Sequence, residues 1–262
     1  MSSQPPRTSQ AQFDRQAPHY NAEWNAWNEK SLQWLVQRAQ CRPSHYLLDV
    51  ATGTGFTAVA FASLVAAVTG VDVSEGMLEQ ARAKARAAGR TNVVFQTAPA
   101  EALPFPPASF DRVVSRVAPH HFLSIPKFLA EAHRVLRPGG RLLVADTCVL
   151  EGAPELDAWQ NHIEILRDPS HIRSYAPSEW RAFVTAAGFA LEELDEVRET
   201  AVISMRSWLE KAGCRGENAS EVRRLFLEAP PEAARMFTIA LQPDGDIAFR
   251  YPRVALSARK PE

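Results

Sequence analysis

The chain has 262 residues, 46% of them hydrophobic, which is enough to bury one sizeable core. Its 29 Lys and Arg nearly balance its 30 Asp and Glu, which leaves a net charge of −1. This balance provides no long-range field for a polyanion, so it argues against a dedicated nucleic-acid binder and favours a small-molecule partner. No Gly/Ser-rich linker, repeat or low-complexity block divides the chain, so we expect one domain with a helical insertion.

Cysteine usage and hydropathy predict a cytoplasmic protein without membrane association. Cys41, Cys148 and Cys214 form neither a C-x-x-C pair nor an even disulfide framework. The N-terminal residues are polar and lack the apolar core of a signal peptide. Residues 56–71 carry no charge, but they are rich in Ala, Thr and Ser. A buried helix followed by a buried strand explains this stretch better than a membrane span does.

The pattern of apolar residues in the first part of the chain predicts alternating helices and strands. Residues 1–18 are expected to be loosely attached, whereas the helical spacing of Trp24, Trp27 and Trp34 predicts a helix reaching about Ala39. Strands and helices then alternate, which is typical of a parallel sheet covered on both faces. The predicted strands are 46–50, 65–73, 93–97, 110–115 and 141–146, and the helices between them are 56–64, 74–89 and 128–136.

After Thr147 the pattern changes to helices at roughly 155–167 and 178–187, a strand near 191–203, and two more helices. Two apolar runs within residues 237–258 flank a Pro-Asp-Gly-Asp turn and predict an antiparallel hairpin. The expected fold is therefore α/β, with a Rossmann-like, mostly parallel seven-stranded sheet, an antiparallel C-terminal hairpin and helical insertions.

A glycine loop after the first predicted strand indicates a ligand site. In Gly53-Thr54-Gly55 the glycines allow a sharp turn and close approach of a ligand, while amides of the next helix face it. Asp72 ends the next predicted strand, where a carboxylate can accept both hydroxyls of a ribose. Two adenosine cofactors remain possible here, because Gly53-x-Gly55-x-x-Ala58 also satisfies the dinucleotide fingerprint. A glycine turn with a solvated Asp is a simpler but less favoured explanation of the two features together.

Three observations favour S-adenosylmethionine over a dinucleotide. Asp49 lies four residues before Gly53, where it can reach an ammonium group that a dinucleotide does not have. None of the four tyrosines is followed by a Lys four residues later, so the usual short-chain reductase pair is missing. The predicted terminal hairpin is also foreign to ordinary dinucleotide domains.

Several motifs follow one another in a fixed order between residues 45 and 147. They are Leu47–Gly55 (LLDVATGTG), Glu101–Phe105 (EALPF), Ser109–Val114 (SFDRVV), Arg116–Phe122 (RVAPHHF) and Glu131–Gly140 (EAHRVLRPGG). Together they resemble class I S-adenosylmethionine-dependent methyltransferases, particularly the ubiquinone/menaquinone-biosynthesis-like (methyltransferase type 11) group. The segment DPSHIR at 168–173 is similar to a segment of uncharacterised bacterial members, so the resemblance extends over nearly the whole chain.

The resemblance implies which residues would bind the methionine and ribose parts of the cofactor. Asp49 and the backbone at Ala51 and Gly53 would hold the methionine end. Gly55 would allow close approach, and Asp72 would bind the ribose.

At the adenine end, the resemblance places Val73 and Met77 beside the base and gives Ala100 an amide contact to it. The chain departs from the family pattern at one position. Where relatives usually carry an Asp that accepts the adenine amino proton, this chain has Pro99, so adenine recognition is expected to depend on Glu101 or on a carbonyl group.

The resemblance also implies that Arg116 begins the loop below the sulfonium and that Tyr20 closes over the cofactor. His120 and His121 follow the fourth predicted strand, at the edge where open α/β sheets bind ligands. Only one is expected to face the site, and His121 is the first candidate for a general base or substrate contact. A loop-fixing histidine bonded to backbone is the alternative.

Four segments make up the expected single domain: an N-terminal helical cap (1–40), a cofactor-binding core (41–147), a helical lid (148–180), and C-terminal helices with closing strands (181–262). His171 and Arg173 in the lid are candidate contacts to the acceptor, with Arg173 as a domain-bracing residue the alternative.

No Pro-Cys pair or Asn-Pro-Pro-Tyr loop is present, which argues against nucleic-acid methylation. The loop 115–119 has no carboxylate, so we expect no metal site. The predicted function is metal-independent transfer of a methyl group from S-adenosylmethionine to a small molecule by in-line displacement. An NAD(P)-dependent oxidoreductase and a non-catalytic S-adenosylmethionine-binding module are the alternatives, and the chain is expected to be a monomer or homodimer.

Overall fold

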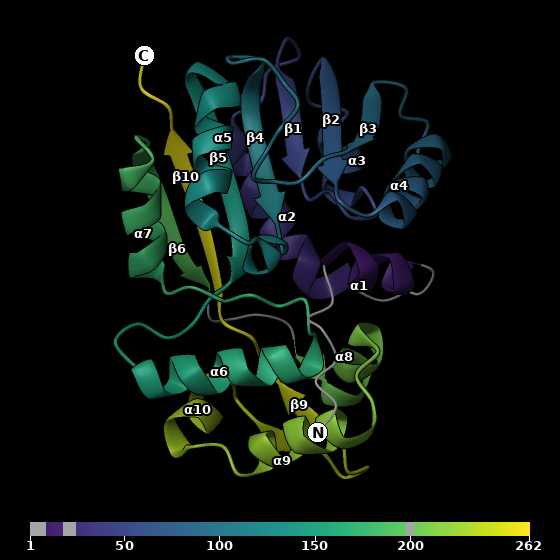
Figure 1. Cartoon of the computed structure of the whole chain (residues 1–262), viewed down its shortest axis with the longest axis vertical. Helices are drawn as coiled ribbons and strands as arrows, with labels where there is room; N and C mark the ends of the chain where they lie inside the picture. Colours follow the sequence, from purple (N-terminus) through teal and green to yellow (C-terminus); the bar gives the residue numbers. More distant parts are fainter. Residues whose placement is uncertain (1–8, 18–24, 198–201) are drawn as a thin grey trace.

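A seven-stranded sheet forms the centre of the computed structural model, which describes residues 9–17, 25–197 and 202–262. The strand order is β3-β2-β1-β4-β5-β10-β6, and only β10 runs antiparallel to its neighbours. The strands are β1 (Tyr46–Val50), β2 (Ala67–Asp72), β3 (Val93–Thr97), β4 (Phe110–Arg116), β5 (Leu136–Thr147), β6 (Ala190–Val197) and β10 (Arg253–Arg259). This arrangement confirms the predicted α/β class and its parallel core (Figure 1).

Helices cover both faces of this sheet, and we call the whole unit the sheet body. One face packs against α2 (Asn25–Ala39) and α3 (Phe56–Phe61). The other face packs against α5 (Ile125–Val135) and α7 (Pro177–Ala186). Strands covered on both faces bury nearly all their central side chains, which is why Val113-Val114 in β4 and the run 142–145 in β5 are apolar.

The remaining helix of the sheet body, α4 (Glu75–Ala87), follows β2 and contacts β3. Its start is fixed by the cap residue Ser74, whose Oγ accepts a hydrogen bond from the Met77 amide at 3.1 Å. Its apolar residues recur at helical spacing, and Met77, Leu78, Ala81 and Ala85 are all buried.

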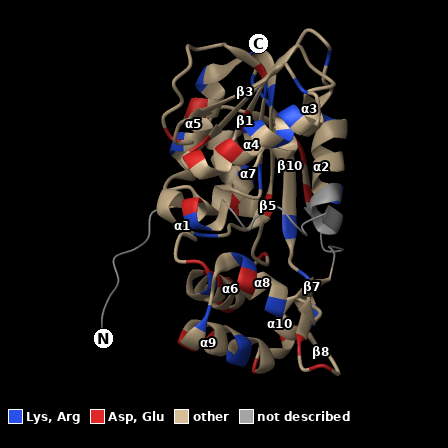
Figure 2. Ribbon diagram, turned by 90° about the vertical axis from the view of Figure 1, so that its right-hand side faces the viewer, with Lys and Arg blue, Asp and Glu red and all other residues tan. Residues whose placement is uncertain are grey.

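A second unit, the helical body, lies at the carboxyl edge of the sheet (Figure 1). It contains α6 (Pro154–Arg167), α8 (Met205–Ala212), α9 (Gly216–Leu227), α10 (Pro231–Met236) and a small sheet of β7 (Ile203–Ser204), β9 (Ile247–Phe249) and β8 (Ala240–Leu241). Its buried core is separate from those of the sheet body and is rich in aromatic residues, including Trp208, Phe226, Phe237, Phe249 and Tyr251. Acidic and basic residues are interspersed along the helices of both bodies (Figure 2).

The expectation that residues 1–18 are loosely attached is wrong for α1 (Ser9–Gln16). The Asp14 Oδ1 of this helix accepts a hydrogen bond from the Ser74 hydroxyl at the start of α4. The Gln12 Nε2 donates to the last carbonyl of α8 at 3.1 Å. The helix therefore connects the two bodies, and the polar partners that hold it lie far away in the sequence.

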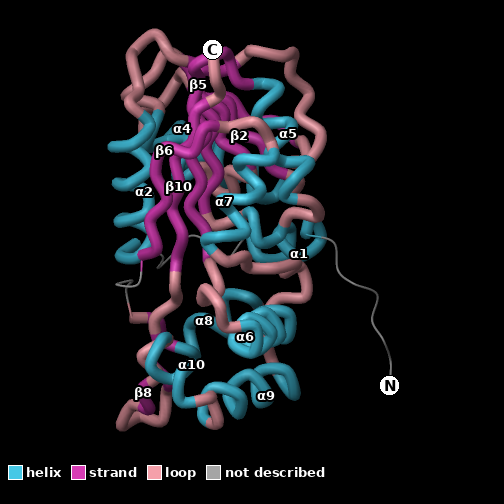
Figure 3. Tube along the Cα trace, turned by 90° about the vertical axis from the view of Figure 1, so that its left-hand side faces the viewer, coloured by secondary structure: helices cyan, strands magenta, loops and turns pink. Residues whose placement is uncertain are grey.

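The predicted hairpin over residues 237–258 forms across its predicted turn, but it does not lie in the main sheet. Only β10 joins the main sheet, where it pairs with β5 and β6, whereas β8 and β9 pair with each other in the helical body (Figure 3). The chain leaves one sheet for the other at Arg250-Tyr251-Pro252. Proline has no N–H to donate to a strand ladder, so it favours such a break.

Within the segment 148–180, predicted as a helical lid, α6 belongs to the helical body, whereas α7 begins only at the end of this segment and packs on β6. Within the described part of the chain, no helix has the length and apolar character needed to cross a bilayer.

Candidate active site

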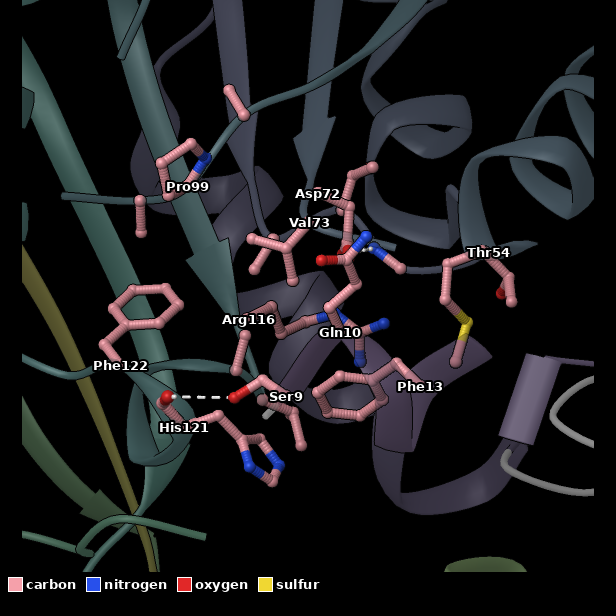
Figure 4. Close-up of a pocket in the computed structure, with 18 of the residues that line it drawn as sticks. Ser9, Gln10, Phe13, Thr54, Asp72, Val73, Pro99, Arg116, His121 and Phe122 are labelled. Carbon is pink, nitrogen blue, oxygen red and sulfur yellow. Dashed lines mark hydrogen bonds between the residues drawn. The ribbon is translucent and has the colours of Figure 1, made fainter. Parts of the chain in front are cut away.

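A cavity of about 560 Å³ lies at the carboxyl edge of the sheet (Figure 4). Its volume falls in the range of roughly 300–1,000 Å³ that small-molecule sites occupy. Parallel strands end at the same edge, so the loops after β1, β2, β3 and β4 all reach the cavity, and α1 contributes from outside the sheet. Lining residues include Ser9, Gln10, Phe13, Ala51, Gly53, Phe56, Thr57, Asp72, Val73, Met77, Lys84, Pro99, Ala100, Glu101, Arg116, Val117, His121 and Phe122.

The Asp72 carboxylate supports the glycine loop from the end of β2. Its Oδ2 accepts from the Gly53 amide at 2.9 Å, and its Oδ1 accepts from the Ser74 amide at 3.0 Å. Burial raises the pKa of Asp72, and these amide hydrogen bonds oppose the rise. Each carboxylate oxygen has a further lone pair, so Asp72 can also accept from hydroxyl groups of a ligand in the cavity.

The two glycines of the loop have different structural roles. Gly53 has a φ of +53°, and a Cβ built there would meet no atom within 4 Å, so its open side can accept a ligand. Gly55 has a φ of +77°, but a Cβ there would lie 2.8 Å from the Cβ of Ala81. The close approach that Gly55 permits is therefore that of α4, and Gly55 does not line the cavity.

Asp49 is predicted to contact an ammonium group of the ligand. It is buried behind the glycine loop and does not line the cavity. Its side chain is 1% exposed, and its Oδ2 accepts from the Thr52 hydroxyl at 2.6 Å. Burial raises the pKa of Asp49 to about 7, against the opposing effects of the Thr52 hydrogen bond and the charge of Arg116. Asp49 is thus connected to the cavity lining by its hydrogen bond with Thr52 and by its electrostatic interaction with Arg116.

The residues predicted to contact adenine come from the loops after β2 and β3 and from the start of α4. Val73, Met77, Pro99 and Ala100 all line the cavity. The Glu101 Oε1 accepts from the Leu123 amide at 2.8 Å, which ties the loop after β3 to the loop after β4. Glu101 is therefore partly engaged with the protein's own backbone.

His120 and Asp146 form a buried pair after β4 and β5. The Asp146 Oδ2 accepts from the His120 amide at 2.7 Å, and its Oδ1 lies 2.6 Å from the His120 Nδ1. An ionised carboxylate can only accept a hydrogen bond. It therefore holds the imidazole as the tautomer with the proton on Nδ1, which leaves Nε2 as the acceptor nitrogen.

The neighbouring His121 is held by a backbone carbonyl. Its Nδ1 lies 3.0 Å from the Ser170 carbonyl oxygen, and the ring of Phe13 packs edge-on against it with centroids 4.9 Å apart. Burial, followed by the charge of His120, lowers the pKa of His121 to about 4. His121 is therefore bonded to the backbone, as in the loop-fixing alternative, and it also lines the cavity.

A smaller cavity of about 50 Å³ lies between the sheet body and the helical body. It shares Phe13, Val117 and His121 with the main cavity, so the two adjoin. Its lining also includes His120, Thr147, Glu164, Arg167, Asp168, Trp208, Lys211, Tyr251 and Arg253. His121 therefore lines both cavities, whereas His120 lines the small cavity and not the main one.

His171 and Arg173, predicted as acceptor contacts, line neither cavity. The His171 Nε2 lies 3.0 Å from the Asn161 Oδ1, and Arg173 forms ion pairs with Asp157 at 2.7 Å and with Glu179 at 3.2 Å. The bracing alternative therefore describes Arg173. From the predicted lid it is the end of α6 that reaches the small cavity.

Tyr20 lies outside the described residues. The aromatic side chain that α1 places in the cavity is Phe13, beside Ser9 and Gln10 (Figure 4). One signal for this helix is present in the sequence, a lone Phe within a polar segment, and it is too short to establish helical periodicity.

Comparison with known proteins agrees with this geometry. The methyltransferase domain family matches residues 48–144. An uncharacterized methyltransferase of Bacillus subtilis, YcgJ, is 35% identical over 238 residues, which cover 91% of this chain and 93% of the relative. A demethylmenaquinone methyltransferase of Symbiobacterium thermophilum is 38% identical over 143 residues, which cover 50% of this chain and 55% of the relative.

Solved structures show the same similarity. The crystal structure of YcgJ matches with a TM-score of 0.84 at 36% identity and covers 89% of this chain and 99% of that one. A putative methyltransferase from Bacillus halodurans also gives 0.84, at 33% identity, and covers 89% of this chain and 100% of the other.

The chain belongs to the class I S-adenosylmethionine-dependent methyltransferases. This confirms the predicted enzyme class and the predicted cofactor, S-adenosylmethionine, over the NAD(P)-dependent and non-catalytic alternatives.

Proposed function

We propose that this methyltransferase acts on a small molecule whose nucleophilic group lies where the two cavities meet. The observation that carries the proposal is the shared lining of Phe13, Val117 and His121. A ligand that fills the main cavity is thereby next to the space that reaches His120. S-adenosylmethionine supplies a methyl group on a sulfonium, and in-line displacement of that group depends mainly on alignment of the reactants.

The main cavity fits the cofactor in the chemistry of its lining. Asp72 offers carboxylate oxygens for the ribose hydroxyls, and the bare face of Gly53 leaves room for a ligand against the backbone. Val73, Met77 and Ala100 provide an apolar wall for a base, with Pro99 in place of the usual Asp. We assign these residues to cofactor binding together with Ala51, with Asp49 supporting the loop from behind.

His120 is our candidate for a general base, with Asp146 as its positioning residue. The Asp146 carboxylate fixes the tautomer and would stabilise the imidazolium that forms when Nε2 takes a proton from the acceptor. His121 is the weaker candidate, because burial lowers its pKa to about 4. General bases act best when their pKa is near the working pH.

The reaction we propose requires no metal and no nucleic-acid partner. The carboxylates in the main cavity lining are Asp72 and Glu101, which sit on different loops and accept hydrogen bonds from backbone amides. The near-zero net charge gives no attraction for a polyanion. The separate cysteines, all free, suit a reducing cytoplasm.

A radiolabel experiment tests the acceptor class. The protein is incubated with methyl-labelled S-adenosylmethionine and a bacterial cell extract, with and without a chelator. The extract is then separated by ultrafiltration into small molecules, protein and nucleic acid. We expect label in the small-molecule fraction in both conditions. Label confined to protein or nucleic acid would contradict the small-molecule assignment, and loss of transfer in chelator would contradict metal independence.

Cofactor binding has an independent readout in stability. S-adenosylhomocysteine at about a hundredfold its Kd should add ~2.7 kcal/mol to the free energy of unfolding. For a chain near this size each kcal/mol raises the melting temperature by roughly 2–4 °C, so the melting temperature should rise by roughly 5–10 °C. NADH and NADPH at the same concentration should leave the melting temperature unchanged.

A further inference from the structure

We propose that Arg116 is the residue that binds the carboxylate of the cofactor's methionine end. This inference rests on the proposed placement of S-adenosylmethionine in the main cavity. It gives a reason for a permanent positive charge beside a ligand that itself carries a sulfonium.

Arg116 is the last residue of β4 and lines the main cavity. Figure 4 shows its side chain among those of Asp72, Gln10 and Phe13. Its Nε donates to the Thr57 hydroxyl at 2.9 Å, and Thr57 is buried in the first turn of α3, directly after the glycine loop. The guanidinium is thus fixed on the side of the cavity that the loop borders.

The order of the strands places Arg116 at the methionine end. The edge runs β3, β2, β1, β4, with Ala100 of the adenine wall after β3 and the ribose acceptor Asp72 at the end of β2. The next positions along the edge belong to the glycine loop after β1 and to Arg116 after β4. A ligand whose base and ribose occupy the first two positions extends its amino-acid end toward the last two.

Charge decides which group of the ligand Arg116 meets. A guanidinium repels a sulfonium and an ammonium, and the one anionic group of S-adenosylmethionine is its carboxylate. A guanidinium binds a carboxylate through charge-assisted and often bidentate hydrogen bonds. Asp49 lies close enough for the charge of Arg116 to act on it, so the buried carboxyl lies on the side that suits the ammonium of the same ligand.

Lys84 is the other cation in the lining, and it provides a matched control. The charged ends of both residues lie over the ring of Phe56, Lys84 at 5.4 Å and Arg116 at 5.6 Å from the centroid. Lys84 extends from α4, whereas Arg116 is anchored to α3 through Thr57. A general electrostatic effect of the cavity would involve both residues, and a specific carboxylate contact only Arg116.

The test compares two ligands that differ in one group, S-adenosylhomocysteine and its decarboxylated analogue, by calorimetric titration. For the wild-type protein we expect S-adenosylhomocysteine to bind about 10- to 100-fold more tightly, as one charge-assisted hydrogen-bonded contact would give. Arg116→Gln should remove that advantage by weakening S-adenosylhomocysteine while leaving the analogue nearly unchanged. Lys84→Gln should preserve the ratio, and Thr57→Val should reduce it a few-fold.

An unchanged ratio of the two affinities in Arg116→Gln would overturn the proposal. This would be so whether both ligands bind more weakly by the same factor or neither affinity changes. The second result would instead suit an arginine that binds the acceptor. Binding of the analogue to Arg116→Gln also shows that the variant is folded. If the wild-type protein binds neither ligand, the cofactor site itself is misassigned, and that failure is distinct from a lost preference.

Discussion

The sheet body and the helical body differ in how their sequences form a core. The sheet body buries mainly aliphatic strands between helices, and its loops meet at one edge because its strands are parallel. The helical body is assembled from segments far apart in the chain, around an aromatic cluster in which the Phe226 and Phe249 rings lie 4.8 Å apart. Local motifs define the first core, whereas long-range packing defines the second.

This difference corresponds to a division between the proposed cofactor-binding site and the proposed acceptor site. Cofactor-binding groups lie in short loops fixed by their own strands, as with Asp72 and Gly53. The small cavity needs both bodies, because Thr147 comes from the sheet and Trp208 from α8. The acceptor side of the site therefore depends on how the two bodies are joined, and the four predictions below test that division.

The largest effect is expected where the two cavities meet. His120→Gln should lower the rate of methyl transfer to the acceptor found in the labelling experiment by about 10²–10⁴-fold, the usual contribution of a general base. Affinity for S-adenosylhomocysteine should stay near the wild-type value, since His120 does not line the main cavity. His121→Gln is the matched control and should lose less. Equal losses in the two variants would remove the distinction between the histidines.

Cutting a large side chain from each core tests whether the bodies are separable. Phe226→Ala in the helical body and Phe128→Ala in the sheet body should each cost about 3–5 kcal/mol of folding free energy, because both rings are buried. Denaturant unfolding measures the loss. Phe226→Ala should retain S-adenosylhomocysteine binding at low temperature, whereas Phe128→Ala should weaken it. Loss of binding in both variants would mean that the cofactor site requires the helical body.

The two glycines of the loop offer a finer test within the sheet body. Gly53→Ala should cost about 1–2 kcal/mol of stability, the cost of a left-handed backbone, and should also weaken cofactor binding. Gly55→Ala adds a clash with Ala81, so it should cost a further ~1–3 kcal/mol from overpacking against α4. Denaturant unfolding and calorimetric titration of both variants give the two quantities. Equal stability losses would contradict the separate roles.

The fourth expected effect is a loss of stability in acid that originates at two buried histidines. Burial lowers the pKa of His171 to about 2 and that of His121 to about 4, against ~6.5 in an unfolded chain. Below about pH 6.5 the unfolded chain takes up protons that the folded chain does not, so this stability is present above pH 6.5 and lost as the pH falls. Between about pH 7.5 and 5 each histidine should cost about 2 kcal/mol.

His171→Gln should reduce that acid-dependent loss by about 2 kcal/mol, as measured by urea unfolding at both pH values. Asp49 acts in the opposite direction, because its pKa is raised to about 7 and its contribution is lost as the pH rises from about 4 to 7. The comparison between wild type and His171→Gln cancels the contribution of Asp49. An identical acid-dependent loss in both proteins would show that His171 does not contribute.

Sequence patterns predicted the sheet body well because its information is local. The strand at 93–97 has the predicted bounds, and α4 lies within the helix predicted at 74–89. The position of Asp72 beside the glycine loop followed from strand parallelism alone, since consecutive parallel strands end at the same edge. The same reasoning failed for residues 247–258, because one apolar run does not reveal that β9 and β10 join different sheets.

The sequence by itself determined the parallel core, the cofactor and the edge at which the cofactor site forms, because alternating elements and short loops fix these within a few dozen residues. Only the tertiary structure decided that α1 covers the cavity through Phe13, that Gly55 serves α4 rather than the ligand, and that His120 pairs with Asp146. Each of these depends on a contact between residues separated in the chain. Such contacts are selected by packing and by the need to pair buried polar groups, and neither leaves a periodic pattern in the sequence.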